Sequence, residues 1–114
     1  MQLNHINMKQ LVFNKIKTTD GFLFKREKNR VTIEGNSITV SSLPFLFFSG
    51  KYFIHSVEKE NRICTVFKVV KADGKESEPN FDKLLFDEWH IYITKSGKKV
   101  MLYNNSREGV ILKA

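Results

Sequence analysis

The chain has 114 residues, of which 41% are apolar and 27% charged, with a single cysteine and a formal net charge of +7. This length suits one domain with one hydrophobic core, and a lone cysteine excludes an internal disulfide and favours a reducing compartment. The longest apolar run, LPFLFF at residues 43–48, is too short to span a bilayer.

The amino-terminal stretch MQLNHINMKQ lacks the basic start and the apolar run of a secretory signal. We therefore expect a cytoplasmic protein that does not associate with a membrane. Residues 1–8 are expected to form a flexible tail and residues 9–114 a single β-rich domain.

Two hairpins are predicted in the first third of the domain, because apolar residues alternate with polar ones. The first joins residues 9–17 to residues 22–26 across the turn TTDG, with Ile16 opposite Phe24. The second is RVTIEGNSITV at residues 30–40, which turns at Gly35 and Asn36. Its register matches like residues across both faces: Ile33 with Ile38, Val31 with Val40, and Thr32 with Thr39.

The segment SSLPFLFFSGKYFIH, residues 41–55, concentrates five aromatic rings. If Ser49 and Gly50 form a turn, Phe47 faces Tyr52. A further hairpin between residues 51–57 and 63–70, turning at Glu60 and Asn61, sets Tyr52 opposite Val69 and Ile54 opposite Phe67. We interpret these positions as one core patch. Three apolar residues remain on the opposite face, either covered by a helix or exposed as a hydrophobic contact surface: Leu46, Phe48 and Phe53.

The polar stretch KADGKESEPN, residues 71–80, predicts a loop. The period then changes in NFDKLLFDEW, which predicts one short helix near residues 80–88, with Asn80 as its N-cap and Trp89 on its apolar face. A fourth hairpin joins residues 90–94 to residues 99–103, with Ile93 opposite Val100. A last strand is predicted at residues 109–113.

Eight to ten short antiparallel strands must protect their edges, so the fold class is mainly β, a meander that closes into a barrel-like or two-layer sheet. Charge is unevenly distributed along this meander. Residues 1–57 carry eight Lys or Arg against three acids, residues 58–94 six against eight, and residues 95–114 five against one. In a closed meander the first and last strands are neighbours, so the two basic segments share one side.

Residues that carry chemistry are sparse. The spacing of His5, His55 and His90 resembles no zinc site, and Cys64 lies in a strong strand pattern as a small apolar residue. No phosphate-binding loop or catalytic motif is present. We therefore expect neither an enzyme nor a bound metal or cofactor.

Basic residues cluster in FKREKNR and KSGKK, which we interpret as two turns. Basic tips can straddle phosphates, although lysine at a turn also keeps an exposed edge soluble. The expected function is a small basic binding protein that engages an anionic partner, a nucleic acid or a nucleic-acid-processing complex. The candidate contacts are Lys25, Arg26, Lys28, Arg30, Lys95, Lys98 and Lys99.

Two alternatives stay open at this point. One is a protein-binding module or an inhibitor encoded by a phage or mobile element, which acts by occluding a partner and uses exposed aromatic residues as anchors. The other is a barrel that holds a small ligand among its phenylalanines. The oligomeric state is not indicated by any sequence pattern.

Overall fold

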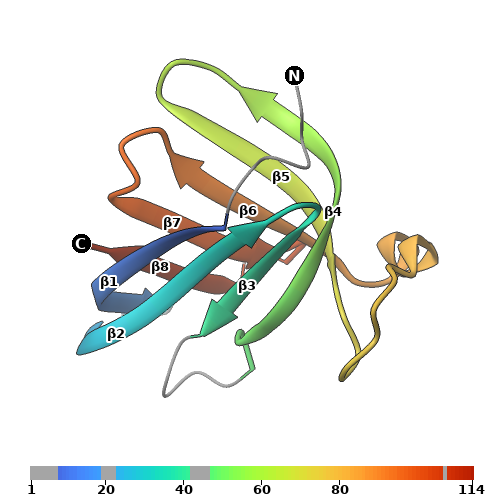
Figure 1. Ribbon diagram of the computed structural model, residues 1–114, viewed down its shortest axis with the longest axis horizontal. Helices are drawn as coiled ribbons and strands as arrows, with labels where there is room; N and C mark the ends of the chain where they lie inside the picture. The colour runs from blue at the N-terminus through green and yellow to red at the C-terminus, as the bar shows by residue number, and fades with distance from the viewer. Residues whose placement is uncertain (1–7, 19–22, 42–46, 107) are drawn as a thin grey trace.

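The computed structural model describes residues 8–18, 23–41, 47–106 and 108–114, with the backbone alone for residues 23–28. Eight antiparallel strands follow one another in chain order around a closed barrel (Figure 1). The strands are β1 (Lys9–Thr18), β2 (Leu23–Glu34), β3 (Ser37–Ser41), β4 (Gly50–Glu60), β5 (Cys64–Lys71), β6 (Glu88–Thr94), β7 (Lys99–Asn104) and β8 (Gly109–Lys113). The predicted fold class, a mainly-β meander, is thereby confirmed. Of the two predicted forms, the barrel and the two-layer sheet, the structure is the barrel.

Closure of the barrel rests on the pairing of β1 with β8, in which Ile16 lies opposite Leu112. The strand β8 approaches its other neighbour, β7, very closely at Gly109. A Cβ atom at this position would stand 1.9 Å from the carbonyl oxygen of Leu102, so only glycine fits there. Because β8 pairs with β1 on one side and with β7 on the other, no sheet edge is left between the first and last strands.

The short-turn hairpins have the predicted registers. Ile16 lies opposite Phe24 in the first hairpin. In the second, Ile33 pairs with Ile38 and Thr32 with Thr39, across a turn in which Gly35 has a φ of 60°, a conformation that glycine adopts without strain. The β6–β7 hairpin and the last strand are also confirmed, with Ile93 opposite Val100.

The hairpin of β4 and β5 differs from its prediction. Ile54 lies opposite Val69 and Tyr52 opposite Lys71, two positions away from the predicted partners. The turn is wider than two residues, because the Asn61 side chain accepts hydrogen bonds from the backbone N–H groups of Ile63 and Cys64. Two bulges in β4 each bring the pairing one position back toward the predicted register, so that the difference falls from four positions beside the turn to two at Ile54. No hydrophobic period and no turn motif in the sequence marks either the wide turn or the bulges.

The predicted core patch is confirmed except at Phe47: Tyr52 and Val69 are buried in the core, and Ile54 and Phe67 pack against it. Tyr52 pairs with Ile38 of β3, whereas Phe47 lies in a turn and is 65% exposed. Phe47 is therefore not a core residue. Phe45 and Leu46 lie outside the described residues.

The predicted helix is shorter and of another type. It is a 3-10 helix, η2 (Phe81–Leu85), and its N-cap is Asn80 as predicted, with the side chain accepting a hydrogen bond from the Asp82 N–H. Trp89 does not share its apolar face. Trp89 belongs to β6 and is 2% exposed inside the barrel, because the chain turns into β6 directly after residue 87.

The core fills the barrel with branched aliphatic side chains and three aromatic ones, Phe13, Tyr52 and Trp89. The polar side chain of Asn29 is also buried among them, on β2 opposite Phe13. Among the described residues its Nδ2 atom has no hydrogen-bond partner. A buried amide N–H donor without a partner costs about 1–3 kcal/mol.

Replacing this amide by an apolar group of similar size should therefore stabilise the fold. We expect Asn29→Leu to raise the free energy of unfolding by about 1–2 kcal/mol, because the desolvation cost is removed and apolar burial is added. Urea unfolding followed by circular dichroism measures this. A loss of stability would show instead that the amide group has a partner in solution.

Candidate functional site

Four lysines lie in direct register across four neighbouring strands. Lys99 of β7 is opposite Lys113 of β8, Lys113 is opposite Lys15 of β1, and Lys15 is opposite Lys25 of β2. We call these four residues the lysine row. It crosses the seam at which the barrel closes, so its members come from both ends of the chain (Figure 1).

The alternation of the strands turns Lys15, Lys99 and Lys113 outward. Lys15, Lys99 and Lys113 each stand next to a core residue in the sequence, and these neighbours, Ile16, Val100 and Leu112, are at most 1% exposed. Successive side chains of a strand point to opposite faces of the sheet. Lys15 and Lys113 are accordingly exposed and Lys99 is half-buried.

The electrostatics of the row are unfavourable for the protein alone. Neighbouring strands lie about 4.8 Å apart, so the row spans about 14 Å, and like charges directly opposite each other are destabilising. The ion pairs found within the described residues are Lys83–Asp73, His90 with Glu58 and Glu88, and Lys95–Glu60. No acidic side chain in that part of the chain pairs with Lys15, Lys99 or Lys113.

Further basic residues surround the row. Lys17 lies on the same outer face of β1, two positions beyond Lys15, and is exposed. Lys98 is exposed in the turn that precedes β7, and Arg30 is exposed on β2 opposite Val12. The basic surface thus follows the outer walls of β7, β8, β1 and β2.

Only some residues of the two predicted basic clusters lie in or near the lysine row. Lys25 and Lys99 are members of the row, and Lys98 and Arg30 lie near it. Lys95 does not belong to it, because its ammonium group is 2.7 Å from the Glu60 carboxylate. The side chains of Lys25, Arg26 and Lys28 lie outside the described residues, so that Lys25 is assigned to the row by its backbone register alone.

The shape of the first basic cluster also differs from the prediction. FKREKNR is not a turn but part of the continuous strand β2. Between the pairs Phe13–Asn29 and Lys15–Lys25, residues 26–28 of β2 stand opposite Asn14 alone, which is a bulge.

Lys15 and Lys113 were missed by the sequence analysis. Each stands beside a branched apolar residue in a period-two pattern, which is a signal for an outward position. Their convergence, however, depends on the pairing of β1 with β8.

The predicted hydrophobic contact residues have different surroundings. Phe53 is 1% exposed, so that it is not available to a partner, and Lys51 lies over its ring at 5.1 Å. Phe48 packs against the core, with its ring centroid 6.0 Å from that of Trp89. Leu46 lies outside the described residues.

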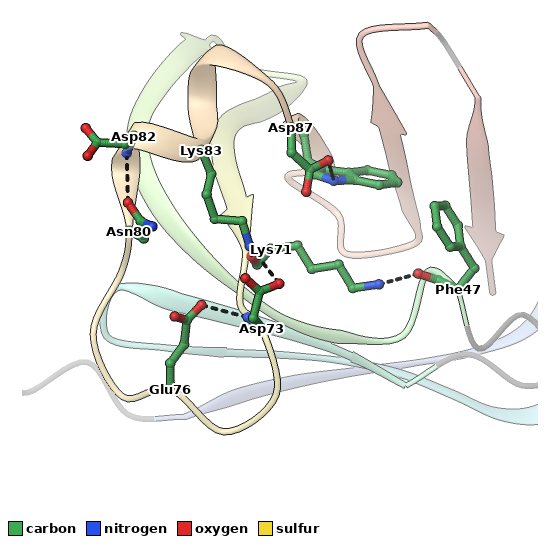
Figure 2. A network of polar contacts seen from close by, with 9 residues as sticks. Phe47, Lys71, Asp73, Glu76, Asn80, Asp82, Lys83 and Asp87 are labelled. Carbon is green, nitrogen blue, oxygen red and sulfur yellow. Dashed lines mark hydrogen bonds and ion pairs between the residues drawn. The ribbon is translucent and has the colours of Figure 1, made fainter.

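Most of the described part of the aromatic run is therefore engaged inside the protein. The Tyr52 hydroxyl donates a hydrogen bond to the Phe48 carbonyl, and burial raises the pKa of Tyr52, with a further contribution from Asp87. Lys71 donates to the Phe47 carbonyl (Figure 2) and lies over the rings of Phe47 and Tyr52. Burial lowers the pKa of Lys71, an effect that Asp87 opposes. These contacts close the barrel end at which β4 and β6 begin.

An acidic segment lies away from the lysine row. Residues 72–87 carry five acids and two lysines, and Figure 1 shows this segment standing out from the barrel beside β4 and β5. Polar contacts hold it in place (Figure 2): Lys83 bonds to the Lys71 carbonyl and to Asp73, and Glu76 accepts from the Asp73 N–H. Leu85 and Phe86, at the end of η2, are 80% and 89% exposed.

The described residues contain neither a metal-binding cluster nor a membrane-spanning helix. No group of three or more His, Cys, Asp or Glu side chains there is placed to hold a metal ion. Nor does any helix there have the length and apolar character needed to cross a membrane. His90 is held instead by Glu58 and Glu88 and stacks on the Tyr103 ring.

Comparison with known proteins adds no relative: no family model, no curated protein and no solved structure matches the chain.

Proposed function

We propose that this protein is a non-enzymatic binding protein that holds the phosphate backbone of a nucleic acid on the lysine row. The observation that carries the proposal is the direct register of Lys99, Lys113, Lys15 and Lys25 across four strands. A fold gains nothing from such an arrangement by itself, because each adjacent pair repels. A polyanion bound along the row removes this cost and releases its own counterions.

The regular spacing favours a nucleic acid over an acidic protein. A nucleic-acid backbone presents a continuous line of charge, with one phosphate per 3.4 Å of axis in each strand of a duplex. Cations spaced about 4.8 Å apart suit such a line better than the scattered carboxylates of a protein surface. The engaged aromatic run offers few rings for base stacking, so we expect contacts to phosphates rather than to bases.

Salt dependence is the test of this function. If four phosphates are neutralised, the logarithm of the association constant should fall with the logarithm of salt concentration at a slope of about −2.8 for single strands and −3.6 for duplexes. A fourfold rise in salt would then weaken single-strand binding roughly fiftyfold. Fluorescence anisotropy with labelled oligonucleotides measures both slopes.

Two outcomes would contradict the proposal. One is no binding of either oligonucleotide at low salt. The other is binding of polyglutamate, at equal charge, as tight as that of the oligonucleotides, which would favour an acidic protein partner.

A second candidate function is a protein-binding module. The exposed Leu85 and Phe86 at the end of η2 favour it, because adjacent large apolar side chains on a segment held by polar contacts can act as an anchor. Such a partner would present an apolar pocket with a basic rim, since residues 72–87 are acidic. An inhibitor that occludes a partner would use the same surface.

A further inference from the structure

A pocket of about 180 Å³ lies at one end of the barrel. Its apolar lining comes from Ile33, Phe67 and Ile93, of which Ile93 belongs to the core cluster and the other two pack against it. Ile33 and Phe67 are only partly buried. The pocket therefore has an apolar base that is continuous with the core.

One end of the barrel is closed by aromatic side chains, whereas the other end holds the pocket. The end at which β4 and β6 begin is closed by Phe48, Tyr52 and Trp89, with the Trp89 ring in contact with the other two rings. The pocket lies at the opposite end, where β6 ends at Thr94. Barrel mouths are a common location for small-molecule sites.

Cationic and hydroxyl groups complete the lining. Lys9 and Lys95 line the pocket together with Thr65 and Thr94. Within the described part of the chain, Lys9 forms no ion pair, whereas Lys95 pairs with Glu60. This pair is exposed, with 45% and 57% of the two side chains accessible, so that it contributes little and Lys95 can turn to another anion.

We propose that this pocket binds a small organic monoanion, a carboxylate on a short apolar body such as a single aromatic ring. The apolar body lies against Ile33, Phe67 and Ile93, and the carboxylate accepts charge-assisted hydrogen bonds from Lys9 and Lys95. The volume limits the size of the ligand, because 180 Å³ is below the range of about 300–1,000 Å³ for drug-sized ligands. The pocket shares no lining residue with the lysine row, so that it does not depend on the function proposed above.

Benzoate is a suitable probe, with benzyl alcohol as its uncharged counterpart. In titrations followed by amide resonances of the full chain at constant ionic strength, benzoate should bind with a dissociation constant of about 0.1–1 mM, the range for so small a ligand. The shifted resonances should be those of residues around the pocket. Benzyl alcohol should bind about tenfold to a hundredfold more weakly, since it lacks the charge-assisted bonds.

Three variants make the test specific. Lys9→Gln should weaken benzoate binding about tenfold or more, whereas Lys113→Gln, which removes the same charge from the lysine row, should leave it unchanged. Thr65→Phe should fill the pocket and abolish binding, while an unchanged melting temperature shows that the barrel is intact. The proposal is overturned if benzyl alcohol binds as tightly as benzoate, if Lys9→Gln and Lys113→Gln act alike, or if millimolar benzoate shifts no resonance near the pocket.

Discussion

The double variant Lys15→Glu/Lys99→Glu is expected to bind a single-stranded oligonucleotide at least about a hundredfold more weakly than the wild type at low salt. Two charge-assisted contacts are lost, each worth about 1.5–3 kcal/mol, and every 1.4 kcal/mol corresponds to a factor of ten. The new carboxylates also repel phosphate. Fluorescence anisotropy at one low salt concentration measures the change.

The same variant should be more stable than the wild type. Because Lys113 stands between positions 99 and 15 and Lys25 lies opposite position 15, the two substitutions turn three repulsive cross-strand pairs into attractive ones. Each pair contributes about 0.2–1 kcal/mol, so we expect a gain of about 0.6–3 kcal/mol in the free energy of unfolding at low salt. Loss of binding together with a gain in stability cannot be explained by unfolding.

A matched control separates the row from net charge. Lys59→Glu/Lys75→Glu changes the net charge by the same amount at two exposed residues, one on β4 and one in the 72–87 segment. It should retain most of the affinity. Equal losses in both double variants would mean that the protein attracts nucleic acid only through its overall charge.

Trp89→Ala is expected to cost about 3–5 kcal/mol of the free energy of unfolding, the usual range for removing a buried tryptophan. The side chain is 2% exposed and contacts the rings of Phe47, Phe48 and Tyr52. Its indole N–H also donates to Asp87. Urea unfolding must be followed by circular dichroism, since Trp89 is the only tryptophan.

Phe86→Ala provides the contrast for this experiment. Phe86 is 89% exposed, so its removal should change stability by no more than about 0.5 kcal/mol. If Trp89→Ala were as mild as Phe86→Ala, the aromatic closure of the barrel would be wrong.

The sequence predicted the parts of the fold that depend on local pattern. Period-two alternation located the strands, and the turn at Gly35 set its hairpin register directly, because a two-residue turn leaves one choice of partners. The wide turn at Asn61 and the bulges of β4 were not predicted, because the free energy of such irregular backbone depends on how it packs against other strands. Trp89 was assigned to a helix because five residues of η2 precede it with a helical period.

The candidate site was predictable only as a region. Closure of the meander correctly placed the basic first and last segments on adjacent strands, so that Lys25 and Lys99 lie at the two ends of one row. The row itself requires the register of β1 against β8, which joins residues about a hundred positions apart. A one-residue slip in that register would remove Lys15 from its place opposite Lys113 and put the two side chains on opposite faces of the sheet.

The most direct test of the lysine row is the salt slope of the variant Lys15→Glu/Lys99→Glu against that of the wild type. Removing two phosphate contacts should make the single-strand slope shallower by about 1.4, at about 0.7 per contact, whereas Lys59→Glu/Lys75→Glu should leave the slope unchanged. A wild-type slope in the Lys15→Glu/Lys99→Glu variant would show that the nucleic acid binds elsewhere on the protein.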